Sequence, residues 1–295
     1  MQQSDELIEQ LGISIEEAAF LQQVLDEVGN ESETDSISPE TIVAETVDNS
    51  ILQKAMEDNN DSTSRFSSAI WYDKIQQQTI ILAGLGGIGS YVNFLLSRMH
   101  PASIFIYDDD TVETANLSGQ MYTSDDVGKL KTTAVIQHSN KFSGYGSVFA
   151  VDGRFTANSQ GGDIMICGFD NMEARKTFFH AWQRHVRNYT DMADRAKCLF
   201  IDGRLAAERF QVFCIKGDDE YSMQQYEEHW LFDDSEAEET ICSYKQTSFC
   251  ANMIASIMVN CFVNFIANQC DPLIPRDVPF FTEYDASMMF FKTET

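Results

Sequence analysis

The sequence is short of basic residues. Its 295 residues include 20 Lys and Arg against 46 Asp and Glu, a formal net charge of −26 at pH 7. The shortage is greatest over residues 1–63, where 16 acidic side chains accompany a single lysine, Lys54. Such a field repels nucleic-acid phosphates and anionic membranes, so we expect neither as a partner. A basic protein surface would be attracted instead.

Metal-binding motifs are also lacking. The five histidines form no cluster with metal or triad spacing, and no CxxC pair occurs. We therefore expect no structural zinc, mainly buried thiols and a reducing, cytoplasmic location. The N-terminal residues have neither the basic region nor the apolar core of a signal peptide. The cysteines are scattered, at Cys167, Cys198, Cys214, Cys242, Cys250, Cys261 and Cys270.

One stretch, residues 249–267, carries no charge. Polar residues nevertheless recur in and around it at every fourth position, which on a helix draws one slowly winding polar stripe. This pattern favours a helix packed in a protein core over a membrane span. The polar residues are Ser248, Asn252, Ser256, Asn260, Asn264 and Asn268.

Two parts of the chain differ in pattern. Residues 1–62 predict an acidic helical extension, with short amphipathic helices joined by polar linkers. Residues 63–295 predict a single α/β domain in which buried strands alternate with helices. This alternation indicates a Rossmann-like, doubly wound, mostly parallel sheet. We expect parallel strands at 79–83, 103–107, 147–151, 163–167 and 198–202, and antiparallel edge strands at 209–215, 279–284 and 288–292.

A glycine-rich loop joins the first strand to the first helix. Its glycines are Gly84, Gly86, Gly87 and Gly89, and they let the backbone turn tightly and approach a phosphate at the helix N-terminus. Asp108 ends the next strand about 20 residues beyond, where a carboxylate usually accepts ribose hydroxyls. The pattern predicts nucleotide binding, although a tight packing turn without ligand is the alternative. It does not distinguish ATP from NAD.

Three later segments narrow the choice. They are Asp108-Asp-Asp-Thr-Val-Glu-Thr-Ala-Asn-Leu-Ser-Gly-Gln, Val127-Gly-Lys-Leu-Lys and Asp163-Ile-Met-Ile-Cys-Gly-Phe-Asp-Asn-Met-Glu-Ala-Arg. In this order they resemble the ThiF/MoeB/ubiquitin-activating family of adenylyltransferases. Glu239-Thr-Ile-Cys-Ser and Tyr284-Asp-Ala-Ser resemble that family's crossover loop and closing strand pair. The resemblance covers the chain from about residue 63 to its end.

The resemblance implies a set of roles. Asp108 would hold the ribose, while Asn116 and Gln120 would contact the nucleotide. Lys131 would touch the phosphates of ATP, and Asp170 would carry Mg²⁺. Arg65 corresponds to an arginine that the family lends across a homodimer.

Each of these residues also has a simpler interpretation. Asn116 and Gln120 could cap a loop, and Lys131 could be a solvated charge. Asp170 with Asn171 could cap the following helix. Arg175 is interpreted as structural or surface rather than catalytic.

The sequence departs from the family pattern at two expected arginines, which are Gly119 and Ser68 here. An arginine directed at a phosphoryl transition state is worth about 10³-fold or more in rate. Arg154, Arg204 and Arg209 are possible substitutes. If the cations are truly lost, Gly119→Arg should raise turnover more than affinity; if a substitute is present, the rate should fall.

Cys242 corresponds to the family cysteine that can take the activated carboxyl as a thioester or persulfide adduct. Lys245 and the start of the long helix would favour its thiolate, whereas the acidic run 233–239 opposes it. An inert thiol is the alternative.

Together these features predict an ATP- and Mg²⁺-dependent adenylyltransferase acting on the C-terminal carboxylate of a ubiquitin-like or sulfur-carrier protein, as a homodimer. A nucleotide-binding pseudoenzyme that recruits partners is the main alternative. An NAD-dependent oxidoreductase is a third, and it leaves Asn116, Gln120 and Asp170 unexplained.

Overall fold

The computed structural model describes residues 63, 65–151, 153–232, 246–271 and 275–295. By its internal contacts the chain divides into two units, residues 1–56 and 57–295, and every described residue lies in the second. The predicted acidic helices and Cys242 lie outside the described residues. The expected domain boundary at residue 62 therefore stays a prediction.

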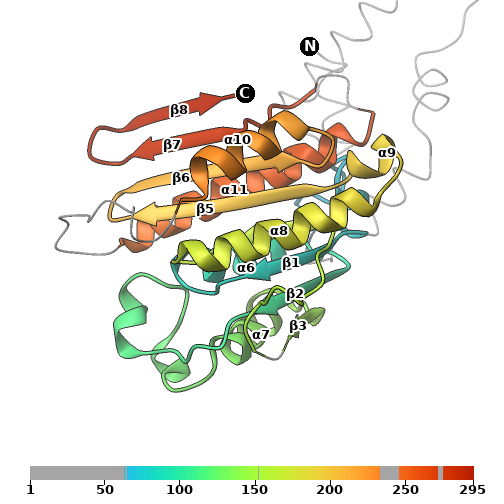
Figure 1. Ribbon diagram of the computed structural model, residues 1–295. Coiled ribbons are helices and arrows are strands. Elements are labelled where there is room, and N and C mark those ends of the chain that lie inside the picture. The colour runs from blue at the N-terminus through green and yellow to red at the C-terminus, as the bar shows by residue number, and fades with distance from the viewer. Residues whose placement is uncertain (1–62, 64, 152, 233–245, 272–274) are drawn as a thin grey trace, which may run out of the picture. The chain divides into compact units, whose positions relative to one another are not determined.

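Eight strands of the described chain form one sheet, in the order β3-β2-β1-β4-β5-β6-β7-β8 (Figure 1). The first five strands in this order, β3, β2, β1, β4 and β5, are parallel to one another. The last three, β6, β7 and β8, each run antiparallel to the strand before them. The predicted mostly parallel sheet with an antiparallel C-terminal edge is confirmed. The bounds are β1 (Thr79–Ala83), β2 (Ser103–Tyr107), β3 (Val148–Ala150), β4 (Ile164–Cys167), β5 (Leu199–Ala206), β6 (Arg209–Lys216), β7 (Phe281–Asp285) and β8 (Phe290–Glu294).

Helices cover both faces of this sheet. Figure 1 shows α8 (Met172–Asn188) and α10 (Glu220–Trp230) in front of the strands, and α6 (Gly87–Ser97) and α11 (Ser248–Asn268) behind them. Because both faces are covered, the central strands are continuous apolar runs rather than alternating ones. The remaining described helices are α5 (Tyr72–Ile75), α7 (Lys131–Ser143), α9 (Met192–Arg195) and the 3-10 helices η2 (Thr114–Ser118) and η3 (Ser124–Asp126).

Each face has its own core. Behind the sheet, aliphatic side chains of α6 and α11 such as Val92, Ile254 and Met258 pack on the strands. In front, the core is aromatic, with Trp182 of α8 and Tyr226 of α10 both fully buried. Both layers depend on burial of large apolar surface, about 25 cal/mol for each Å² removed from water.

In the described part of the chain, one helix is long and apolar enough to cross a membrane by length and composition, namely α11. In the structure, 61% of the most apolar 18-residue stretch of this helix is buried. It packs against α6, β5 and β6. The predicted polar stripe supplies most of its exposed residues, among them Asn252, Ser256 and Asn260, and Phe249 and Met253 are exposed as well.

Candidate nucleotide-binding site

The glycine loop follows β1 at the carboxyl edge of the parallel strands. Gly84 has φ +82°, and a Cβ there would lie 2.7 Å from the carbonyl of Gly168. The loop after β1 thus touches the backbone of the loop after β4, an approach that only glycine permits. At Gly86, the N-cap of α6, a Cβ would meet no atom within 4 Å. Open space therefore lies beside the N-terminus of α6, where an anion is favoured.

Asp108 lies between this loop and its own turn. Its Oδ2 accepts from the backbone N–H of Leu85 at 2.6 Å, and its Oδ1 accepts from the N–H of Asp110 at 2.9 Å. Burial raises the pKa of the Asp108 carboxyl, and the nearby Lys131 ammonium opposes this rise. The carboxylate is therefore fixed against the glycine loop, as a ribose-binding residue requires.

Lys131 is not a solvated charge. It is the first residue of α7 and is only 6% exposed. Its Nζ lies 2.8 Å from Asp110 Oδ2, and its backbone N–H donates to the Asp110 carbonyl at 2.9 Å. The structure thus places one buried ammonium beside Asp108 and Asp110, near the glycine loop.

The segment that contains Asn116 and Gln120 lies against the loop. Asn116 caps η2, because its Oδ1 accepts from the N–H of Glu113 at 2.9 Å. The cap of the simpler interpretation is thus present, and contact of Asn116 with a nucleotide stays a prediction. Gln120 differs: its Oε1 is buried and has no hydrogen-bond partner in the described chain. An unpaired buried oxygen costs about 1–3 kcal/mol, which a bound hydrogen-bond donor would relieve.

Two residues that the sequence analysis did not assign fasten this segment to the loop. Ser90 Oγ donates to the Gly86 carbonyl at 2.7 Å and accepts from the N–H of Met121 at 3.0 Å. Tyr122 donates its hydroxyl to the Leu85 carbonyl at 2.7 Å. Ser90 is the last residue of the glycine motif, so the sequence pattern could have identified it. No sequence pattern marks Tyr122.

Asp170 and Arg65 stand apart from these contacts. Asn171 alone caps α8, accepting from the N–H of Ala174 at 2.8 Å, so the carboxylate of Asp170 is exposed beside the cap. Within the described chain, Asp170 Oδ1 accepts one long bond, at 3.3 Å, from Asn171 Nδ2. Arg65 is exposed in the turn before α5, and no hydrogen bond or ion pair joins it to the other candidate residues that the structure describes.

Arg175 is structural, as interpreted from the sequence. It is buried and donates to the carboxylate of Asp202 and to the carbonyls of Phe169 and Gly203. Burial alone would raise the pKa of the Asp202 carboxyl, but Arg175 and Arg204 outweigh it and hold that pKa below its usual value. This ion pair fixes the loop between β4 and α8, which carries Asp170.

Of the three possible substitute cations, Arg154 is the one that lies near the site. Arg204 pairs with Asp202 at 2.7 Å and stacks over Phe213 with its Cζ 4.7 Å from the ring centroid. Arg209 pairs with Asp285 at 3.1 Å at the antiparallel side of the sheet. Arg154 instead binds Asp109, with Nε 2.8 Å from Oδ2.

Gln246 fills the position next to Gly119. A Cβ on Gly119 would lie 2.8 Å from Gln246 Nε2, and a Cβ on Gly87 would overlap the same amide group. The backbone of Gln246 pairs with Ala207 through an isolated bridge. One glutamine side chain therefore packs against both the start of α6 and the position where the family pattern has an arginine.

Together, the fold and this edge of the sheet define a Rossmann-like α/β protein with a glycine loop and a carboxylate at the end of the second strand. The ThiF family model matches residues 58–294, and the chain belongs to the ThiF family.

Curated relatives match over shorter stretches. The chain is 38% identical over 66 residues to ubiquitin-like modifier-activating enzyme 5 of Oryza sativa subsp. japonica, covering 22% of this chain and 16% of that protein. It is 25% identical over 169 residues to the enzyme of the same name from Drosophila pseudoobscura pseudoobscura, covering 51% of this chain and 41% of that protein. The matches thus span less than half of these relatives.

Solved structures share the fold. Escherichia coli MccB with ATP superposes with a TM-score of 0.56 at 17% identity, covering 80% of this chain and 71% of that chain. PaaA superposes with a TM-score of 0.58 at 15% identity, covering 98% of this chain and 84% of that chain.

Proposed function

We propose that the chain binds ATP with Mg²⁺ and adenylates the C-terminal carboxylate of a ubiquitin-like or sulfur-carrier protein, as a cytoplasmic homodimer. The observation that carries the proposal is the buried Lys131 ammonium, held 2.8 Å from Asp110 beside the glycine loop. A cation at this place suits a triphosphate. Membership of the ThiF family, the name of the curated relatives and the ATP in the MccB structure support the same assignment.

The residues present fit ATP. The open space at Gly86 admits phosphate oxygens to the free N–H groups of α6. Asp108 accepts ribose hydroxyls, and the unpaired Oε1 of Gln120 accepts a donor from the nucleotide. Lys131 offsets the charge on the phosphates. Arg65 of a second copy would add a further cation.

Asp170 fits Mg²⁺ better than the other carboxylates of this edge. The oxygens of Asp108, Asp109 and Asp110 lie within 4.8 Å of one another, but Lys131 and Arg154 already pair with two of them. Asp170 has an exposed carboxylate just beyond the end of β4, and none of the described cations pairs with it. Such a carboxylate is the hard oxygen ligand that Mg²⁺ prefers. The ion, when bound, would neutralise charge that develops on the phosphates.

The reaction is an in-line displacement at the α-phosphorus. A carboxylate oxygen of the carrier forms the new P–O bond, the bond to the bridging oxygen breaks, and pyrophosphate leaves. Lys131 and the N-terminus of α6 contribute by stabilising charge on the phosphates, and no side chain needs to accept a proton. The acyl group would then pass to a thiol, for which Cys242 is the predicted residue. A bond forms between sulfur and the carbonyl carbon, the bond from that carbon to the phosphate oxygen breaks, AMP leaves, and the thiol proton goes to solvent.

A nucleotide-binding module without turnover is the second candidate. It is favoured by Gln246, a neutral side chain packed against Gly119 where the family pattern has a cation. The module would bind ATP as tightly as an enzyme does, because affinity depends on the glycine loop and Asp108. An NAD-dependent oxidoreductase is less well supported, since Lys131 and Asp170 would have no role in it.

Calorimetry of the full chain with ATP·Mg²⁺ and with NAD tests the nucleotide. We expect ATP to bind at least tenfold more tightly, with Mg²⁺ dependence lost in Asp170→Ala. The matched control is Asp125→Ala, an exposed carboxylate in η3. Tighter binding of NAD would overturn the proposal.

A further inference from the structure

A second cluster of reactive side chains lies at the amino ends of the parallel strands. The glycine loop lies at their carboxyl ends, on the opposite side of the sheet. Asp163 immediately precedes β4, and Cys198 immediately precedes the neighbouring parallel strand β5. His185 lies in the last turn of α8, which returns from the carboxyl edge to the amino edge. Three segments far apart in sequence therefore meet at the amino ends of two paired strands.

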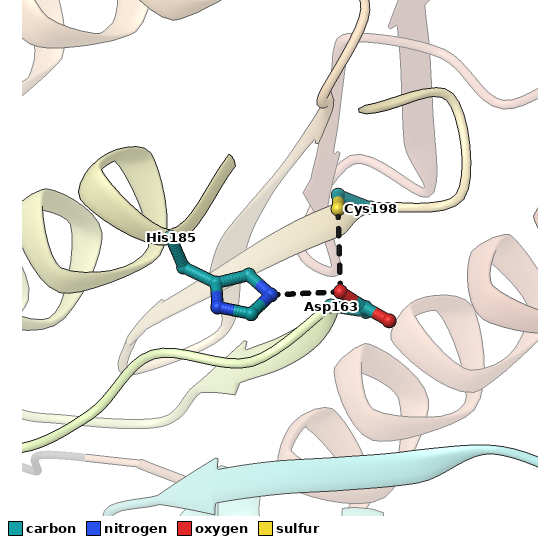
Figure 2. A group of neighbouring side chains, drawn as sticks. All are labelled: Asp163, His185 and Cys198. Atoms are coloured by element: carbon teal, nitrogen blue, oxygen red, sulfur yellow. Dashed lines mark hydrogen bonds and ion pairs between the residues drawn. The ribbon is translucent and has the colours of Figure 1, made fainter. Parts of the chain in front are cut away.

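Figure 2 shows the carboxylate of Asp163 between the other two side chains. Asp163 Oδ1 lies 2.8 Å from His185 Nε2 and 3.6 Å from Cys198 Sγ. The three ligand atoms all lie within 4.8 Å of one another. Tetrahedral zinc sites have Zn–N and Zn–O distances of about 2.0–2.2 Å and Zn–S of about 2.3 Å, so neighbouring ligands are about 3.3–3.6 Å apart. The distance from Asp163 to Cys198 matches this spacing, whereas the hydrogen-bonded pair of Asp163 and His185 is closer and would have to separate by about 0.5 Å to admit the ion.

We propose that Asp163, His185 and Cys198 bind a borderline-soft divalent cation, with Zn²⁺ as the preferred ion. The three side chains are the protein ligands, and the fourth coordination position is open. The donor set of one oxygen, one imidazole nitrogen and one thiolate sulfur is typical of zinc and unsuited to Mg²⁺ or Ca²⁺. On binding, the Cys198 thiol releases its proton to solvent. The proton that His185 Nε2 donates to Asp163 Oδ1 is also exchanged through solvent, so that Nδ1 carries the imidazole proton and the Nε2 lone pair bonds the metal. No electron is transferred.

The surroundings support the ligands in their places. Tyr189 donates its hydroxyl to Asp163 Oδ1 at 2.9 Å, and the indole N–H of Trp182 donates to the Asp163 carbonyl at 3.3 Å. Such contacts orient ligands in metal sites. The side chains of Asp163 and His185 are 44% and 28% exposed, so an ion and a fourth ligand can reach them from solvent.

The same geometry argues against a catalytic cysteine here. A nucleophilic dyad needs the histidine next to the thiol as its base, but Asp163 lies between His185 and Cys198 (Figure 2). A carboxylate beside a buried sulfur disfavours the thiolate unless a cation is added. The sequence prediction of no zinc rested on the lack of CxxC pairs. The proposed site departs from that prediction, because its three ligands come from separate segments that no sequence motif joins.

Titration of the metal-free full chain with Co²⁺ tests the site, because Co²⁺ replaces Zn²⁺ and reports its ligands by absorption. We expect one equivalent to give a near-ultraviolet thiolate-to-cobalt band and the visible bands of tetrahedral coordination, both abolished by added Zn²⁺. Cobalt held only by Asp108, Asp109 and Asp110 would give no thiolate band. The two groups are therefore distinguished.

Cys198→Ser should remove the thiolate band, and His185→Gln should weaken Co²⁺ binding at least about 100-fold. One matched control is Cys270→Ser, since Cys270 is a half-buried thiol outside the cluster. The other is His180→Asn, since His180 lies on α8 like His185 and its Nε2 is 3.3 Å from Glu227 Oε1. Both controls should keep the spectrum. Absence of a thiolate band in the wild type, or a band that survives Cys198→Ser, would overturn the proposal. Circular dichroism checks that each variant folds.

Discussion

The side chain of Gln246 occupies the space that a side chain at position 119 would need, with its Nε2 2.8 Å from where a Cβ of Gly119 would lie. The two residues are far apart in the sequence, and no sequence pattern predicts that they are in contact. They form one unit of packing at the edge of the glycine loop. We therefore expect substitutions at positions 119 and 246 to have coupled effects.

This relationship changes the expected effect of restoring the arginine. Gly119→Arg alone should lower ATP affinity and exchange rate, because the longer side chain must displace Gln246. The double variant Gly119→Arg/Gln246→Ala should recover both. We expect a coupling of at least about 1 kcal/mol, roughly fivefold, from the double-mutant cycle in pyrophosphate exchange. Independent effects of the two substitutions would refute the link.

Lys131→Ala should reduce exchange by about 10²–10³-fold, the usual loss when one donor to transition-state charge is removed. It should also move the acid limit of ATP binding to higher pH. Lys131 opposes the raised pKa of Asp108, so its loss raises that pKa further, and Asp108 becomes neutral at a higher pH. Lys141→Ala, at the exposed end of the same helix, should change neither.

Asp126 should make the fold sensitive to acid. Burial alone would raise the pKa of its carboxyl, but hydrogen bonds from Thr123 and Lys129 and the charge of His138 hold that pKa well below its usual value. A depressed carboxyl pKa stabilises the fold above the unfolded pKa of about 3.9, and this stability is lost as pH falls below it.

Asp126→Asn lacks this contribution. Urea unfolding should show the variant clearly less stable than wild type at pH 7, with the difference shrinking steadily as the pH falls from about 5 toward the depressed folded-state pKa. Asp125→Asn, next to it and exposed, is the control. A difference that stays constant with pH would contradict the assignment.

Arg175→Ala should cost about 1–3 kcal/mol of unfolding free energy, because the buried Asp202 carboxylate and the Phe169 carbonyl lose a donor while Arg204 still pairs with Asp202. Arg175→Met keeps the Arg204–Asp202 pair and more of the side-chain packing, and it should regain part of this stability. It should not regain exchange activity, since the loop that carries Asp170 still lacks its anchor to the Phe169 carbonyl. Denaturant unfolding and exchange on the same samples separate the two effects.

Removal of residues 1–61, which leaves Ser62 as the first residue, should leave ATP binding intact. The ThiF match begins at residue 58, and the boundary around 58–64 is polar. Calorimetry of the shortened chain should give the same ATP affinity within about twofold. Aggregation of the shortened chain would show that the extension covers apolar surface of the domain.

The sequence predicts the sheet well, because the central strands are unbroken apolar runs between helices and their type does not depend on distant contacts. The expected strand at 163–167, for example, is β4 at Ile164–Cys167. It also predicts that Asp108 lies by the glycine loop, since the order strand, loop, helix and strand fixes that proximity.

Side-chain partners across distant segments could not be predicted in the same way. Arg154 with Asp109, Gln246 with Gly119, and the meeting of Asp163, His185 and Cys198 each depend on how crossovers bring separate loops together. Burial of Lys131 was likewise hidden, because a lysine beside Lys129 has the pattern of a solvated charge. The reactivity of Cys242 stays a prediction.

Pyrophosphate exchange tests the central claim most directly. The full chain is incubated with ATP, Mg²⁺ and labelled pyrophosphate, with and without candidate carrier proteins that have a free C-terminal carboxylate. We predict that label enters ATP only with a carrier present, that Asp170→Ala abolishes it, and that Asp125→Ala does not. Tight ATP binding with no exchange for any carrier, and equally none in the Gly119→Arg/Gln246→Ala variant, would contradict the adenylyltransferase assignment in favour of the binding module.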